Sequence, residues 1–258
     1  MMSKTVLITG AGSGFGLGVA LGLAARGHRV IAGCHIWPQV TALRARAKAD
    51  GLALEVIKFD VTSEIDRQHA LEREVDVLLN NAGVMESGPT TEIPLPVVRS
   101  VFEVNVFAAL AVAQGVAKQM VRRGSGRIVW VSSVAGLVKV PFDGAYAASK
   151  HAVEGMCSAL REELKSYGVQ VVTVNPGAYR TGFNDTGMES ADQWWHQAER
   201  TVAPWPKREL KRQSDPAEMV AAMIEVIEAE HPPYRTVRPA SAEQMVREEQ
   251  AEEWALRV

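Results

Sequence analysis

The stretch "TVLITGAGSGFGLGVALGLAA", residues 5–25, joins a β-branched run to a glycine-rich turn and then to an apolar segment with helical spacing. Glycine at positions 10, 14 and 16 lets the chain turn tightly and brings backbone amides close to a pyrophosphate, whose charge the helix N-terminus would stabilise. A glycine cluster after a strand is often only a tight turn, but the strand before it and the helix after it favour dinucleotide binding. We therefore predict that this stretch begins a nucleotide-binding fold.

Other short apolar runs repeat the pattern of this first strand. They lie at residues 29–34, 54–59, 75–80, 126–133 and 169–175, and segments with helical spacing lie at 15–26, 38–49, 96–123 and 146–167. Runs that are apolar throughout are typical of parallel strands buried on both faces. The alternation predicts an α/β fold, with a doubly wound Rossmann-type parallel sheet of about seven strands and helices on both faces.

The domain organisation follows from the absence of a linker-like stretch, which predicts a single domain over residues 1–258. Residues 183–215 fit neither pattern, because they are rich in tryptophan, proline and charge, and we interpret them as an excursion over the sheet edge. After this excursion, Asp215 is a candidate N-cap with Pro216 at the first helical position. The tail from residue 241 predicts one more short helix.

Charge and composition argue against several classes of partner. The net charge of −2, with both signs spread along the chain, gives no reason to expect nucleic acid or a membrane surface, so we predict a small-molecule partner. The apolar runs fall short of about 18 residues, which predicts no membrane-spanning helix. The 2 cysteines and 6 histidines lack ligand spacing, which predicts no metal site. The N-terminus lacks a signal-peptide pattern, and we expect a cytoplasmic protein.

Further motifs follow the glycine turn along the chain. They are "DV" at 60–61, "NNAG" at 80–83, an asparagine at 105, a serine at 133, "YAASK" at 146–150 and "PG" at 176–177. With the spacing T-G-x-x-x-G-x-G at 9–16, the chain resembles the short-chain dehydrogenase/reductase family over residues 5–181. The resemblance implies an enzyme that transfers a hydride between a nicotinamide cofactor, NADP or NAD, and a carbonyl compound or alcohol. Fold and family alone do not name the substrate.

Tyr146 and Lys150 are the expected catalytic pair. A tyrosine with a pKa of about 10 is a poor acid or base at neutral pH unless a cation stabilises its phenolate. At positions i and i+4 of one helix, Lys150 can approach both Tyr146 and a bound ribose. The alternative is that the two residues are incidental neighbours on an amphipathic helix. In the resembled family the matching tyrosine protonates the carbonyl oxygen or deprotonates the alcohol, and we predict that role for Tyr146.

Two further residues complete the predicted catalytic group. Ser133 ends the run "GRIVWVSS", where its hydroxyl would hold the developing charge on the substrate oxygen. Ser132 competes for that place, but adjacent strand side chains point to opposite faces, and the spacing to the tyrosine selects Ser133. Asn105 interrupts an apolar helix face. In the family the matching asparagine carries a water that links the lysine to a proton relay, and the alternative is a plain helix kink.

The resemblance also implies the cofactor contacts. Asp60 would bind the adenine with Val61 against the ring, unless Asp60 only forms an Asx turn at the strand end. The "NNAG" backbone would lie near the adenine ribose, and "NPGAYRT" at 175–181 along the nicotinamide amide, with Thr181 as a hydroxyl contact. The predicted cofactor-binding residues are Gly10, Ser13, Gly14, Phe15, Gly16, His35, Asp60, Val61, Asn81, Ala82, Gly83, Tyr146, Lys150, Pro176, Gly177 and Thr181.

The choice between NADP and NAD rests on the end of the second strand, "AGCHI" at 32–36. An acidic residue there would bind the ribose 2′-hydroxyl, and a basic one the 2′-phosphate. Cys34 stands where NAD enzymes of the family carry aspartate, and His35 stands where many NADP enzymes carry arginine. Without a carboxylate to repel a phosphate, and with Ser13 or His35 as donors, we favour NADP, although a neutral histidine is a weak substitute for arginine.

The excursion suggests the kind of substrate. It holds Trp194, Trp195 and Trp205, which would form an aromatic lid over the site or, equally, anchor the loop or a subunit contact. With Phe142 and Phe183 beside the catalytic positions, they favour an apolar or aromatic ketone or secondary alcohol. One alternative is an acyl-carrier-protein-type 3-oxoacyl reductase, with the basic run "PKRELKRQ" at 206–213 as its docking patch. Another is a non-catalytic NADP-binding regulator.

The chain departs from the resembled family at two places. Between positions 60 and 80 it is short, so the helix there is expected to be reduced to a turn or two. The C-terminal stretch lacks the usual glycine-rich ending, which argues against the family's common tetramer. We therefore expect a homodimer that pairs through the helices at 96–123 and 146–167.

Overall fold

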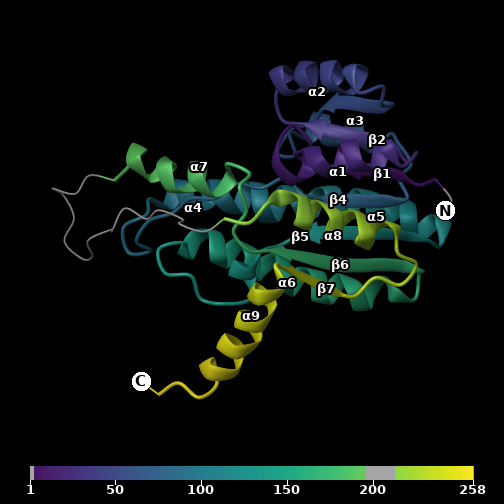
Figure 1. Cartoon of the computed structure of the whole chain (residues 1–258). Coiled ribbons are helices and arrows are strands. Elements are labelled where there is room, and N and C mark those ends of the chain that lie inside the picture. The colour runs from purple at the N-terminus through teal and green to yellow at the C-terminus, as the bar shows by residue number, and fades with distance from the viewer. Residues whose placement is uncertain (1–2, 196–212, 258) are drawn as a thin grey trace.

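Seven parallel strands form one sheet in the computed structural model, which describes residues 3–195 and 213–257 (Figure 1). Their order across the sheet is β3-β2-β1-β4-β5-β6-β7. The strands are β1 (Thr5–Ile8), β2 (Arg29–Cys34), β3 (Leu54–Lys58), β4 (Val77–Asn80), β5 (Gly126–Val131), β6 (Val169–Pro176) and β7 (Arg235–Arg238). This confirms the predicted doubly wound sheet and places its switch point between β1 and β4, where such folds bind ligands.

Helices cover both faces of this sheet. On one face lie α1 (Gly14–Ala25), α2 (Trp37–Ala49) and α8 (Pro216–Glu228). On the other lie α4 (Leu95–Phe102), a π-helical turn (Glu103–Ala108), α5 (Ala109–Arg123) and α6 (Gly144–Lys165). The helix between β3 and β4 is reduced to α3 (Glu64–Ala70), as predicted. The predicted tail helix is α9 (Ala240–Glu253), which projects away from the sheet in Figure 1.

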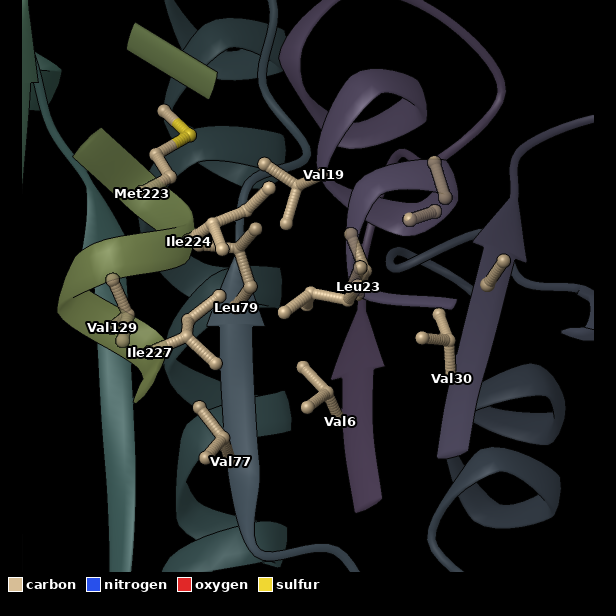
Figure 2. Close-up of a cluster of buried hydrophobic side chains, with 14 of the residues drawn as sticks. Val6, Val19, Leu23, Val30, Val77, Leu79, Val129, Met223, Ile224 and Ile227 are labelled. Atoms are coloured by element: carbon tan, nitrogen blue, oxygen red, sulfur yellow. The ribbon is translucent and has the colours of Figure 1, made fainter. Parts of the chain in front are cut away.

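Alternating strand residues supply the two buried layers. Val6 and Ile8 pack in the cluster that α1 and α8 complete, whereas Leu7 between them packs in the cluster on the α5 and α6 side. Figure 2 shows part of the first cluster, in which the labelled side chains are Val6, Val19, Leu23, Val30, Val77, Leu79, Val129, Met223, Ile224 and Ile227. Because both faces of the central strands are buried, their sequences are largely apolar, and this is the pattern from which the sheet was predicted.

Two glycines let α1 and α8 approach closely. A Cβ atom added at Gly18 would lie 2.8 Å from the Val220 Cγ2, and one at Gly22 would lie 2.6 Å from the Ile224 Cδ1. The two glycines are four residues apart and share one helix face, so they form a shallow groove for α8. The glycines of "LGVALGLAA" therefore serve helix packing, a role that was not predicted from the sequence.

The helix predicted at 96–123 is continuous from Leu95 to Arg123, apart from its π-helical turn. It contains a window of mean hydropathy 1.7, and it is long and apolar enough to span a membrane, with 33% of that window buried inside the fold. The prediction of no membrane-spanning helix rested on the length of uninterrupted apolar runs, and by length and mean hydropathy this one helix does qualify. Here Val112, Ala113 and Val116 pack against the sheet, and core helices of compact folds pass the same test.

The excursion at 183–215 has fixed ends. It begins with α7 (Phe183–Glu189) and a 3₁₀ turn (Ser190–Gln193), while Trp205 and the basic run up to residue 212 lie outside the described residues. The Arg180 amide donates to the Ser214 carbonyl at 3.0 Å, and the Ser214 amide donates to the Ala178 carbonyl at 2.9 Å. The two ends of the excursion are thus hydrogen-bonded to each other between β6 and α8.

Replacing Leu23 with alanine is expected to lower the free energy of unfolding by about 2–5 kcal/mol, because its side chain is fully buried in the cluster of Figure 2. Urea denaturation followed by circular dichroism measures the change. Leu95→Ala is the matched control, since Leu95 on α4 is 65% exposed, and it should change stability by less than about 0.5 kcal/mol. Equal effects of the two substitutions would contradict the assignment of this core.

Candidate active site

A cleft of about 460 Å³ lies at the carboxyl ends of β1, β4, β5 and β6. Loops that leave parallel strands share one edge of the sheet, so motifs far apart in sequence meet there. Of the predicted site residues, the cleft is lined by Gly10, Ser13, Gly14, Phe15, Asn81, Ala82, Gly83, Ser133, Tyr146, Lys150, Pro176, Gly177 and Thr181. The predicted residues outside its lining are Gly16, His35, Asp60, Val61 and Asn105.

The glycine positions of the turn are ones at which a side chain would be unfavourable. Gly10 and Gly14 have φ angles of 67° and 52°, and a Cβ atom at Gly16 would lie 2.4 Å from the Gly10 carbonyl oxygen. Asn81 holds the turn, because its Nδ2 donates to the Thr9 carbonyl at 2.9 Å and to the Gly10 carbonyl at 3.2 Å. The turn leads into the N-terminus of α1, where backbone amides can receive an anion. This cradle fits the pyrophosphate of a dinucleotide.

Tyr146 and Lys150 lie together on α6, as predicted, at the other end of the cleft. Their exposed fractions are only 7% and 4%. The Lys150 Nζ lies 5.6 Å from the centre of the Tyr146 ring and donates to the Val131 carbonyl at 2.9 Å. The ring of Phe183 lies 5.9 Å from that of Tyr146 and closes the site on the α7 side. The pair is thus a buried phenol and ammonium that both border one cleft.

Burial sets the pKa values of this pair. It raises the pKa of the Tyr146 phenol to about 12, while a hydrogen bond with Ser133 opposes the rise and the Asp143 carboxylate adds to it. Burial lowers the pKa of the Lys150 ammonium to about 8, against the opposing effects of Cys157 and Glu154. The predicted lowering of the tyrosine pKa by Lys150 is not seen in this structure, where the Val131 carbonyl holds the ammonium.

Ser133 contacts Tyr146, and its Oγ accepts a hydrogen bond from the Ala135 amide at 3.1 Å. Ser132 also borders the cleft, but its Oγ is buried and has no hydrogen-bond partner among the described residues. The backbone at Ser133 is still extended, and the expectation that only one of the two serine side chains reaches the substrate stays a prediction. The Ser133 side chain forms a hydrogen bond with the Tyr146 side chain.

Asn105 lies in the π-helical turn, a feature that is frequent at functional sites. Its Oδ1 accepts from the Val84 amide at 2.8 Å, and its Nδ2 donates to the Val84 carbonyl at 2.8 Å and to the Ser149 Oγ at 3.0 Å. A Cβ atom at Gly83 would lie 3.2 Å from the Asn105 Oδ1 and 3.7 Å from the Lys150 Nζ. Asn105 therefore clamps the loop after β4 to α6 directly beneath the cleft, and its water-relay role stays a prediction.

The end of β2 differs from what its motif predicted. Cys34 is fully buried in the first core cluster, so its thiol does not face a ribose. The His35 ring is 65% exposed, and its Nε2 lies 3.4 Å from the Asp60 Oδ2. The Asp60 Oδ1 accepts from the Thr62 amide at 3.0 Å, which is the Asx turn considered as the alternative. Val61 is buried in the second core cluster, and the adenine contacts of both residues stay predictions.

The groups around the Asp60 carboxyl favour its ionised form. Burial alone would raise the pKa of Asp60, but hydrogen bonds from Thr62 and the charges of His35 and Lys58 outweigh it and hold the pKa below its usual value. An exposed His35 and a half-buried Asp60 thus form a pair at the ends of β2 and β3. A 2′-phosphate placed there would meet both an imidazole and a carboxylate.

A buried network behind the catalytic residues was missed by the sequence reasoning. The Glu154 carboxylate, one turn after Lys150 on α6, accepts from the Arg235 Nη2 and from the Asn175 Nδ2, each at 2.6 Å. The Asn175 Nδ2 also donates to the Ser133 carbonyl at 3.2 Å. The network joins α6, β6 and β7 to the serine. No sequence signal marks it, because its members lie in separate elements.

The opposite wall of the cleft comes from the loop after β4 and from α7. Met85, Glu86, Asn184 and Ser190 line it, and none of them was singled out from the sequence. Trp194 does not line the cleft, since its indole packs where a Cβ atom at Gly88 would lie, 2.3 Å from the Trp194 Cη2. This tryptophan therefore anchors the excursion, which was the alternative to an aromatic lid.

Comparison with known proteins is consistent with this site. The family model described as short chain dehydrogenase matches residues 4–191. An uncharacterized oxidoreductase of Myxococcus xanthus is 38% identical over 192 residues, which cover 72% of this chain and 76% of the relative.

Solved structures of the same kind superpose over nearly the whole chain. A short-chain dehydrogenase from Streptomyces avermitilis has a TM-score of 0.80 and 27% identity, over 98% of this chain and 94% of that one. A short-chain dehydrogenase from Sphingobium yanoikuyae, solved in complex with NADPH, has a TM-score of 0.77 and 26% identity, over 99% of this chain and 96% of that one.

Arg235→Met is expected to lower the free energy of unfolding by about 2–3 kcal/mol, because it leaves the buried Glu154 carboxylate without its cation. The cost stays at the low end for a buried pair, since the Arg235 side chain is 36% exposed. Chemical denaturation provides the measurement. Arg29→Met is the control, because its pair with Glu55 spans 3.8 Å and is 66% exposed on the arginine side. Comparable losses in the two variants would argue against the network.

Proposed function

The chain belongs to the short-chain dehydrogenase/reductase family and is a nicotinamide-dependent oxidoreductase, and we propose that it interconverts a ketone and a secondary alcohol with Tyr146 as proton donor and acceptor. The observation that carries this proposal is the meeting of Tyr146, Ser133 and Lys150 at the buried end of a cleft that continues to the glycine turn. The bound nicotinamide dinucleotide supplies the hydride donor or acceptor.

Tyr146 is suited to hold and release a proton at its hydroxyl oxygen. Burial raises the pKa of the Tyr146 phenol to about 12, so the phenol keeps its proton at neutral pH, and it becomes an effective donor to a carbonyl oxygen only when a nearby cation stabilises the phenolate that forms. Ser133 forms a hydrogen bond with it and would hold the same substrate oxygen. In alcohol oxidation the phenolate is required, and a Lys150 ammonium turned from the Val131 carbonyl toward the ring would stabilise it. Asn105 acts in this scheme by fixing the loop and helix around the lysine.

The cradle at the other end of the cleft would hold the dinucleotide. The turn at Gly10, Ser13 and Gly14 and the start of α1 would receive its pyrophosphate. The backbone from Asn81 to Gly83 would lie near the adenine ribose, and Pro176, Gly177 and Thr181 near the carboxamide. NADP is favoured over NAD, because the exposed imidazole of His35 at the end of β2 could donate to a 2′-phosphate. The NADPH complex of the Sphingobium relative supports this choice.

The substrate is proposed to present an apolar or aromatic group beside the reacting carbon. Met85 and Phe183 pack against Tyr146 and make the nearest wall of the cleft apolar. A substituent that buries apolar surface there gains roughly 25 cal/mol per Å². A small, fully polar ketone would forgo that contribution.

A homodimer is proposed through the outer faces of α5 and α6. Phe107, in the π-helical turn at the start of α5, is 56% exposed. The outer positions of α6 include Ala148 and Gly155, and a Cβ atom at Gly155 would meet nothing within 4 Å. Small residues of this kind let helices approach, and a partner would cover the phenylalanine.

Tyr146→Phe is expected to lower kcat on a ketone substrate by about 10²–10⁴-fold, because it removes the proton donor and leaves the apolar contacts. The affinity for NADPH should stay within about twofold of the wild-type value. Steady-state kinetics and a fluorescence titration measure the two quantities.

Tyr167→Phe is the matched control, since Tyr167 is 51% exposed and lies just past the C-terminus of α6. It should leave both kcat and the affinity unchanged. Near-normal turnover by Tyr146→Phe would show that another group donates the proton.

His35→Arg is expected to tighten NADPH binding about tenfold, because a guanidinium bonds a 2′-phosphate in a bidentate manner. His35→Asp should weaken NADPH binding by at least about tenfold through repulsion. Titration with NADPH and with NADH, followed by nicotinamide fluorescence, distinguishes the two cofactors. NADH affinity should hardly respond to His35→Arg. Parallel shifts for both cofactors would mean that His35 does not lie at the 2′-position.

A further inference from the structure

The substrate end of the cleft carries one carboxylate. Among the described residues that line the cleft, the charged ones are Glu86 and Lys150. The Lys150 ammonium donates a hydrogen bond to the Val131 carbonyl and lies near Gly83, at the end of the cleft that holds Tyr146. Glu86 comes from the loop after β4 and faces α7, on the wall that would contact a substrate.

The contacts of Glu86 leave it free to accept a further hydrogen bond. Its Oε2 accepts from the Ser190 Oγ at 2.6 Å, which joins the loop to the 3₁₀ turn after α7. Within the part of the chain that the structure describes, its Oε1 accepts no hydrogen bond and no lysine, arginine or histidine pairs with it. The carboxylate is partly buried, so an opposite charge or a donor that reaches it gains more than it would in water.

The apolar and acidic parts of this wall are adjacent in sequence. Met85, the residue before Glu86, packs with Phe183 against Tyr146. A substrate held with its carbonyl at the Tyr146 hydroxyl would contact these apolar residues, and Glu86, the next residue in the chain, lines the same cleft. A molecule with an apolar body next to the reacting carbon and a polar group elsewhere would fit both parts of this wall.

We propose that this remote group is a hydrogen-bond donor, an ammonium or a hydroxyl, which Glu86 accepts. The same carboxylate excludes substrates that carry a carboxylate at that place, because two like charges would share a partly buried site. The inference rests on the proposed ketone and alcohol chemistry. It specifies the substrate class as ketones or alcohols that carry a remote hydrogen-bond donor. It makes Glu86 a specificity-determining residue.

Four para-substituted acetophenones test this assignment. Their substituents are methyl, hydroxymethyl, aminomethyl and carboxymethyl, so the ketone and the ring are constant. Calorimetry on the Tyr146→Phe protein saturated with NADPH gives dissociation constants without turnover. We expect the hydroxymethyl and aminomethyl ketones to bind at least about tenfold more tightly than the carboxymethyl ketone.

Glu86→Gln, in the same background, is expected to reduce the advantage of aminomethyl over carboxymethyl by at least about tenfold, because the charge is lost and the shape is kept. Glu189→Gln is the matched control, since Glu189 is an exposed carboxylate on α7 that does not line the cleft. It should leave the ranking of the four ketones unchanged.

Three results would overturn the inference. They are equal or tighter binding of the carboxymethyl ketone, an unchanged ranking in Glu86→Gln, and no binding of the hydroxymethyl and aminomethyl ketones at millimolar concentration. Turnover of the methyl ketone by the wild-type enzyme is measured separately. Its absence, with the ranking intact, counts against the proposed ketone chemistry and not against the role of Glu86.

Discussion

The buried charge of Lys150 is the constraint on which the catalytic end of the fold depends. Moving an ammonium out of water costs several kcal/mol unless nearby groups compensate. Burial accordingly lowers the pKa of Lys150 to about 8, against the opposing effects of Cys157 and of the Glu154 carboxylate, and the ammonium donates a hydrogen bond to the Val131 carbonyl. Glu154 is itself buried and needs the Arg235 guanidinium. One charge therefore requires a carbonyl, a carboxylate and a second cation, and these come from β5, α6 and β7.

The consequences of this constraint extend to the other site residues. Asn175 bonds Glu154 and the Ser133 carbonyl at once, so the strand that leads to Pro176 and the serine keep one relative position. On the opposite side, Asn81 holds the glycine turn, and Asn105 holds the loop after β4. Three amide side chains, of which those of Asn105 and Asn175 are buried, thus fix the backbone from which the cleft is made. Catalytic groups held this way pay little ordering cost when a substrate binds.

Local patterns account for what could be predicted from the sequence. The strand runs are apolar because both sheet faces are buried, and the Tyr146 and Lys150 spacing needs only one helix turn. Val61 shows the limit, because the motif implies an adenine contact, which stays a prediction, and gives no sign that the side chain is buried in the second core cluster. The network of Glu154, Asn175 and Arg235 could not be predicted, since it depends on how α6, β6 and β7 sit together in space. Glu86 was missed for the same reason, because only the folded position of α7 shows that it faces the cleft.

The excursion after β6 is closed at its base by the hydrogen bonds between Arg180, Ser214 and Ala178. The helix that follows it, α8, is seated on Gly18 and Gly22 of α1, independently of what the excursion contains. The length and composition of the excursion can therefore change while the sheet, the glycine turn and Tyr146 stay where they are. Grafting another segment between Arg180 and Ser214 would therefore change the α7 wall of the cleft and leave the strands that carry the glycine turn and Ser133 in place.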